Sequence, residues 1–178
     1  AGDAMVGSNR NTLMGVNAGG ALITANDCVA IGYNALDAHT TVHAGTIAVG
    51  SESLSALTTG TFNLAIGYQA MQNTTVGDFN LAIGYRALRA NISSDSNVAL
   101  GGRAGENLNG GARNVFVGYV AGQSNVTSSD CIAIGFMALA AGSHDQYGTV
   151  AIGRESLKTV STGLGNTGIG YFAGRFID

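Results

Sequence analysis

Three histidines are the residues of this sequence best suited to bind a metal ion or a polar ligand. His39 and His43 lie four residues apart, and His144 stands directly before Asp145. Histidine pairs at this spacing bind metals mainly when one helix presents both rings on the same face. These histidines instead fall in two segments that lengthen a repeat by one residue. We therefore expect exposed loops without a metal, in which His39, His43 and His144 could contact a receptor.

Catalytic patterns are scarce. The segment GLGNTG, residues 163–168, matches the G-x-G-x-x-G pattern of phosphate-binding loops. Such a loop opens an amphipathic helix and is followed about 20 residues later by an acidic residue, and this segment has neither. No Ser, His and acid arrangement emerges elsewhere. The sequence predicts a protein that is not an enzyme and that binds no cofactor.

A short internal repeat accounts for these segments. NLAIGYQAM at 63–71 returns as NLAIGYRAL at 80–88, and the glycine of this motif recurs at a nearly constant interval along the chain. Its ten positions are Gly15, Gly32, Gly50, Gly67, Gly84, Gly101, Gly118, Gly135, Gly153 and Gly170. Because a fixed period is typical of stacked structural repeats, we interpret residues 1–178 as one array of about ten coils.

The columns of the repeat indicate short β-strands. Branched apolar residues stand three positions and one position before the repeat glycine, usually with alanine between them, as in Leu81-Ala82-Ile83. Alternation with a period of two is a strand signal. We expect the branched columns to form the inward stack, and the alanine and glycine strip to allow another chain to approach. Leu13 and Phe116 replace the alanine, and Phe116 should mark a wider spot or a facing gap.

Composition favours a continuous ladder of strands. The chain has 28 glycines, no proline, 11% charged residues and a net charge of -3. Proline would remove donors from a sheet, and the acidic balance offers no basic footprint for nucleic acid. No apolar run is long enough for a membrane helix, so direct membrane insertion is not expected. No signal peptide precedes the array, which suits a mature or excised piece.

Three further columns carry polar or aromatic side chains. Asparagine recurs four positions before the glycine, where its amides could form a ladder, and Cys28 and Cys131 replace it in coils two and eight. Six coils of about 4.8 Å would separate these cysteines by roughly 29 Å, too far for a disulfide. Aromatic residues follow the glycine, either as a stacked ladder or as a receptor-binding stripe: Tyr33, Tyr68, Tyr85, Tyr119, Phe136 and Tyr171.

The repeated motif resembles a known family. N-[VLI]-A-[ILV]-G-Y-x-A-[LM], with the variants CVAIGYNAL and CIAIGFMAL, is similar to the head repeat of trimeric autotransporter adhesins (YadA-like) and to related repeats of phage tail fibres and bacterial surface fibres. The resemblance extends over nearly the whole chain. It implies three chains around a common axis, each a left-handed parallel β-roll in a shaft or adhesive head. The 17-residue period is longer than that of the adhesin head.

We therefore predict an all-β fold: a left-handed parallel β-solenoid of about ten 17-residue coils, assembled lengthwise as a homotrimer. The predicted function is structural or adhesive, in an extracellular fibre of a bacterial surface or a virion tail. Its partners would be itself, further fibre domains and a cell-surface glycan or protein receptor. Two alternatives remain: an acyltransferase with a hexapeptide-type left-handed β-helix, and a solenoid that binds an ordered lattice. The first needs three hexads per coil, and each coil offers one.

Overall fold

A computed structural model describes residues 1–3, 5, 7, 10–38, 45–141, 147–160 and 163–176. Each coil contributes one strand of three residues, and no helix occurs in this part of the chain. The strands are β1 Thr12–Met14, β2 Val29–Ile31, β3 Ile47–Val49, β4 Leu64–Ile66, β5 Leu81–Ile83, β6 Val98–Leu100, β7 Val115–Val117, β8 Ile132–Ile134, β9 Val150–Ile152 and β10 Thr167–Ile169.

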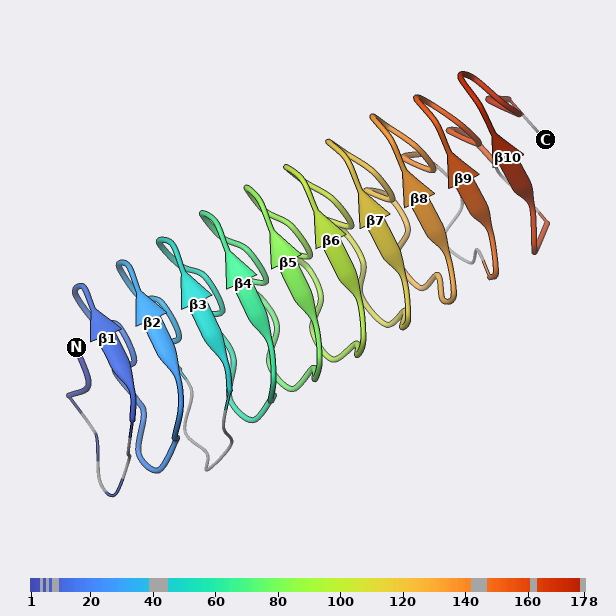
Figure 1. The fold of residues 1–178 in the computed structure, drawn as a ribbon. Helices are drawn as coiled ribbons and strands as arrows, with labels where there is room; N and C mark the ends of the chain where they lie inside the picture. Colours follow the sequence, from blue (N-terminus) through green and yellow to red (C-terminus); the bar gives the residue numbers. More distant parts are fainter. Residues whose placement is uncertain are drawn as a thin grey trace.

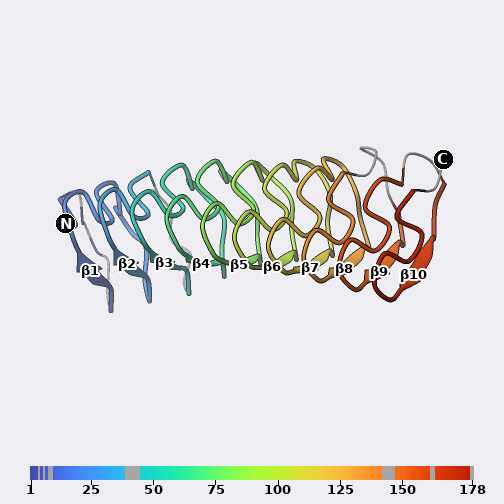
Figure 2. The same cartoon turned by 90° about the horizontal axis from the view of Figure 1, so that it is seen from above.

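All ten strands form a single parallel sheet in chain order (Figure 1). Equivalent residues pair throughout, so Ala65 lies opposite Ala82 and Ala82 opposite Ala99. A view at right angles shows the coils following one another, with the strands along one side (Figure 2). Hydrogen bonds between coils continue on the returning side, where Thr58 N donates to Thr75 O (2.8 Å) and Thr75 N donates to Ile92 O (2.8 Å). The predicted β-solenoid is confirmed.

The repeat glycine is required because successive backbones touch there. Gly67 has a φ of 133°, and a Cβ at this position would stand 2.5 Å from the carbonyl oxygen of Gly84 in the next coil. Only glycine combines this conformation with such an approach. The smooth strip inferred from the sequence therefore accommodates a neighbouring backbone, and that backbone is the next coil of the same chain.

Two tight turns follow each strand. In coil four, Ala70 N donates to Gly67 O (3.3 Å) and Gln72 N donates to Gln69 O (3.4 Å). Gln69 and Met71, the third residues of these turns, have positive φ values of 56° and 52°, as type II turns require. The chain thereby reverses within a few residues and directs Met71 into the coil.

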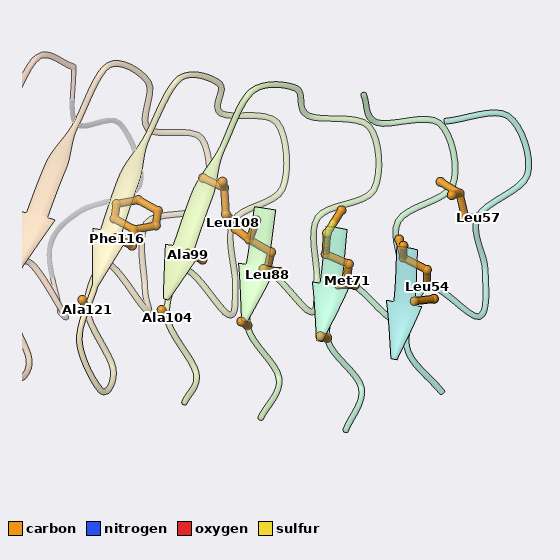
Figure 3. Close-up of a cluster of buried hydrophobic side chains, with 14 of the residues drawn as sticks. Leu54, Leu57, Met71, Leu88, Ala99, Ala104, Leu108, Phe116 and Ala121 are labelled. Carbon is orange, nitrogen blue, oxygen red and sulfur yellow. The ribbon is translucent and has the colours of Figure 1, made fainter. Parts of the chain in front are cut away.

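The inward and outward columns differ from the sequence-based expectation. The central alanine of the strand is fully buried, as at Ala65, Ala82 and Ala99, whereas Ile66 and Ile83 remain 36% and 37% exposed. The interior is filled by side chains that the turns direct inward, including Leu54, Met71 and Leu88 (Figure 3). Because these chains already fill the narrow coil, only alanine fits beneath the strand. The expectation that the branched columns point inward is wrong.

Phe116 is fully buried although its neighbours in the column are alanines. Glycine stands at 105 and 122, where six of the ten coils place Leu or Met, and a Cβ on Gly105 would lie 2.7 Å from the Phe116 ring. Leu13 has the same relation to Gly19, whose Cβ would lie 2.9 Å from it. The predicted facing gap at Phe116 is confirmed, and glycine provides it.

Candidate functional site

The outer face of the sheet is a long apolar surface that runs the length of the rod. We define the outer face as the first and third residue of each strand β1 to β10. Its third residues are about one-third exposed in the middle of the rod, at Ile66, Ile83 and Ile134, and two-thirds exposed at Met14 and Ile169. The period of two turns these side chains away from the coil interior and into one continuous stripe.

The aromatic column borders this face at the strand ends. Tyr68 and Tyr85 stack with ring centroids 5.8 Å apart and planes 9° apart, and Tyr119 stacks on Phe136 at 5.9 Å. Tyr33 and Tyr119 are about half exposed. The predicted ladder is confirmed at these two pairs. Because stacked rings cover one another's faces along the rod, they present mainly ring edges and hydroxyls to a ligand.

A second aromatic pair lies at the strand starts. Phe62 and Phe79 stack at 5.3 Å, with exposed fractions of 53% and 60%. Both have positive φ and stand five residues before the repeat glycine. The sequence reading missed this pair, because only two coils place an aromatic residue there. Together with the tyrosines, they extend the apolar surface beyond both ends of the strands.

The strand-end edge carries most of the basic residues. We define it as the positions one, two and five residues after each repeat glycine. Glu106 has a side chain only 3% exposed, and three arginines surround it: Arg103 at 2.6 Å, Arg89 at 3.4 Å and Arg86 at 4.0 Å. Gln123 donates a further hydrogen bond of 2.8 Å. Burial acts to raise the pKa of Glu106, but the hydrogen bonds from Gln123 and Arg103 and the arginine charges outweigh it and lower the pKa.

A second glutamate repeats this arrangement near the C-terminal coils. Glu155 pairs with Arg175 (2.8 Å), Lys158 (3.1 Å) and Arg154 (3.6 Å). Burial again acts to raise the pKa of Glu155, and the lysine hydrogen bond and the cationic neighbours lower it below the ordinary value. Each cluster holds three cations around one carboxylate, so both leave a positive surplus on the strand-end edge.

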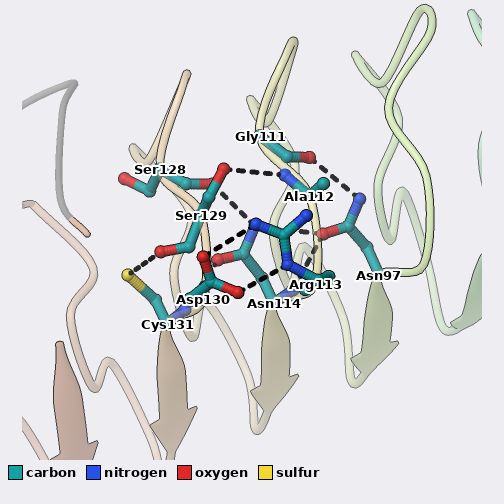
Figure 4. Close-up of polar contacts among 9 residues, drawn as sticks. All are labelled: Asn97, Gly111, Ala112, Arg113, Asn114, Ser128, Ser129, Asp130 and Cys131. Carbon is teal, nitrogen blue, oxygen red and sulfur yellow. Dashed lines mark hydrogen bonds and ion pairs between the residues drawn. The ribbon is translucent and has the colours of Figure 1, made fainter. Parts of the chain in front are cut away.

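The strand-start edge comprises the positions five and six residues before each repeat glycine. Arg113 donates two hydrogen bonds to Asp130 of the next coil (2.6 and 2.8 Å), and Arg10 binds Asp27 in the same way (2.5 and 2.7 Å). Figure 4 shows the Arg113–Asp130 pair beside the asparagine column at the strand starts. These arginines lower the pKa of Asp27 and Asp130 through the hydrogen bonds that they donate.

The asparagine ladder lies directly beneath this edge. Asn97 Oδ1 accepts bonds from the backbone N and the Nδ2 of Asn114, both at 3.0 Å, and Asn97 Nδ2 donates to Gly111 O at 3.0 Å. Equivalent bonds join Asn63, Asn80 and Asn97. The predicted ladder is confirmed, and its role is structural because its members are buried.

A group of three adjoining coils recurs as a unit further along the chain. The 17-residue period alone did not reveal this larger repeat. Arg10, Asp27 and Cys28 correspond to Arg113, Asp130 and Cys131, each 103 positions later. The lengthened coil follows in both copies, and then GTIAVGSESL at 45–54 returns as GTVAIGRESL at 148–157. A comparison of the chain with itself at larger displacements would have found it. The two cross-coil ion pairs are thus copies of one module.

The residues singled out from the sequence are not gathered into one site. His39, His43 and His144 lie outside the described residues. Tyr33, Tyr68, Tyr85 and Tyr119 occupy one row along the strand-end edge. Cys28 and Cys131 are buried and form no disulfide, as expected, and burial raises the pKa of both thiols.

The described part of the chain offers no pocket, no group of three potential metal ligands and no helix able to cross a membrane. Its main candidate for function is therefore the long outer face with its two flanking edges. Comparisons with protein-family models, with curated proteins and with solved structures found no match.

Proposed function

We propose that this chain is a shaft or adhesive-head segment of a homotrimeric extracellular fibre. The outer face of the sheet carries this proposal. Ten strands each contribute two side chains to it, nearly all of them branched and apolar, and no other described segment covers them. Contiguous exposed apolar surface of this extent is typical of an interface rather than of a monomer.

The repeat supplies the physical reason for lengthwise assembly. Each coil contacts only its neighbours, so a partner that covers one coil can cover the next in the same way. Apolar burial then accumulates along the rod at about 25 cal/mol per Å². The AIGY-type motif resembles repeats of trimeric adhesins and fibres, and this resemblance is the reason for proposing three copies.

Recognition by such a fibre would be multivalent. Three copies would present the same turns and loops around one axis to a cell-surface glycan or protein receptor. Binding would then gain from effective concentration rather than from a deep pocket. Further fibre domains would hold the segment at a bacterial surface or a virion tail.

The mass in solution tests the assembly directly. Light scattering coupled to size exclusion should give three times the 17.9 kDa of one chain. Far-UV circular dichroism of the same fraction should show a β spectrum. The mass of a single chain at all concentrations would contradict the proposal, because the outer face would then be stable in water. Binding screens against glycans and cell surfaces would follow only after a trimeric mass.

A further inference from the structure

In coils five and six, the two edges of the sheet carry opposite charge at the same height along the rod. The chain has eight Lys and Arg residues in total. Six of them lie on the strand-end edge: Arg86, Arg89, Arg103, Arg154, Lys158 and Arg175. In coils five and six, three arginines surround the single carboxylate of Glu106, so this short stretch has a surplus of positive charge.

Asp78 and Asp95 lie on the strand-start edge of the same two coils. Each precedes its repeat glycine by six residues. Neither is within ion-pair distance of a cation among the described residues, whereas Asp27 and Asp130 on this edge are held by Arg10 and Arg113. One carboxylate oxygen of each bonds within the chain, since Asp78 Oδ1 accepts from Thr61 N (2.6 Å) and Asp95 Oδ1 accepts from Asp78 N (2.8 Å). The uncompensated negative charge therefore sits opposite the arginine surplus, across the outer face.

Rotational symmetry brings these edges together. The strands lie across the rod, and rotation about an axis parallel to the rod leaves the height of every coil unchanged. When three outer faces turn toward such an axis, the strand ends of one copy must adjoin the strand starts of the next copy. This contact is heterologous and closes into a ring. Coils five and six of one copy then meet coils five and six of its neighbour.

We propose that Asp78 and Asp95 form a charged seam with Arg86 and Arg103 of a neighbouring copy. This inference rests on the proposed homotrimer and names the side chains that join its protomers. The seam also sets the register. The apolar outer face is nearly the same in every coil, so a slip by one coil would preserve much of its packing. The aspartates and the central arginine cluster occupy only two coils, so they match in one register and penalise the others.

Neutral, nearly isosteric substitutions test the seam. Asp78→Asn and Asp95→Asn, made together, keep the oxygens that accept the intrachain hydrogen bonds and remove the charges. Asp37→Asn is the matched control, because Asp37 lies on the strand-end edge of coil two, away from the seam. Urea-induced dissociation, followed by light-scattering mass, would be measured at about 0.01 M and about 1 M salt, where the Debye length falls from about 30 Å to about 3 Å.

We expect the unmodified trimer and Asp37→Asn to dissociate at lower urea concentration in high salt. The double aspartate variant should dissociate early at low salt, corresponding to roughly tenfold weaker association, and should lose most of the salt response. Adding Arg86→Gln to it should cost less than Arg86→Gln costs in the unmodified chain, because the aspartate charges that Arg86 would meet are already absent. A trimeric double variant with unchanged midpoint and salt response would overturn the seam alone. A monomeric unmodified chain would overturn the proposed function, and the seam with it.

Discussion

Phe116 and Gly122 share one space inside the rod: the phenyl ring occupies the volume that a side chain at position 122 would fill. In coils two and five the same two positions hold Ala30 with Leu36 and Ala82 with Leu88. In these coils the turn supplies the large side chain, whereas in coil seven the strand supplies it, and the Phe116 ring also faces Gly105 of coil six.

Because residues 116 and 122 share this space, a substitution at one position should restore stability that is lost by a substitution at the other. Phe116→Ala should lower the free energy of unfolding by about 3–5 kcal/mol, because it leaves a cavity beside two glycines. Gly122→Leu alone should also destabilise the protein, since the leucine would overlap the ring. The double variant recreates the alanine–leucine pair of other coils, and leucine tolerates the backbone there because Leu88 has a φ of 49°. Urea unfolding should show it more stable than either single variant, and additive losses would contradict the shared space.

The asparagine ladder should be sensitive in its centre. Asn97→Ala leaves the Gly111 carbonyl and the Asn114 amide without the partners that Asn97 supplies. Buried polar groups that lose a partner cost about 1–3 kcal/mol each, so we expect a clear loss in the free energy of unfolding. Asn166→Ala is the control, since among the described residues that side-chain amide bonds Gly163 O alone (3.1 Å), in its own exposed turn. Equal losses in the two variants would show that the ladder adds nothing.

Acid should weaken the rod through Glu106. Because the folded pKa of Glu106 is lowered, its contribution is fully present above the ordinary value of 4.5 and disappears as the pH falls through the folded pKa. Glu106→Gln should be less stable near pH 7, and the difference from the unmodified chain should shrink below about pH 4.5. Urea midpoints across this range would measure it. Glu155→Gln should behave alike, and a constant difference across the range would exclude the ionic cause.

Ile83 and Ala82 are neighbours in the sequence with opposite roles. Ile83→Asp places a charge on the outer face, so the β spectrum should persist while the mass falls to that of one chain. Ile92→Asp is the matched control, since Ile92 is 43% exposed on the returning side of the coil. A trimeric Ile83→Asp variant would show that the outer face is not the interface.

Ala82→Trp should instead unfold the chain itself. Ala82 is fully buried on the inner side of β5, and an indole side chain would have no room there beside Leu88. Circular dichroism should show a large fall in melting temperature, whether or not the chain assembles. A variant that folds but does not assemble would instead indicate that the alanine strip lies at the interface between chains.

The sequence predicted the strands, the repeat glycine and the asparagine ladder because each depends on backbone geometry that recurs in every coil. It misassigned the two sides of the strand. A period of two separates Ala82 from Ile83, but it does not say which of two apolar columns points inward. Which column points inward depends on Leu88, because the turn after the strand directs this side chain into the coil.

The edges were harder to predict because their residues do not recur in every coil. Asp78 and Arg86 flank the same strand in the sequence, but only the stacking of the coils shows that Arg86 joins two other arginines around Glu106. The larger repeat likewise joins residues that a 17-residue period treats as unrelated, such as Asp27 and Asp130. Residues that recur at the same position of every repeat predict the scaffold. The features that distinguish one coil from another become visible only in the three-dimensional arrangement.

The parallel sheet also determines how a single chain would respond to tension. Its hydrogen bonds run along the rod from each strand to the next, so a force on the two ends pulls these bonds apart in the direction in which they point. Coils would then detach one after another, and each 17-residue coil would release about 60 Å of extended chain. A single rod under tension would therefore lengthen in steps of nearly equal size. In an assembly, the neighbouring chains packed along its length would have to separate from each coil as it detached.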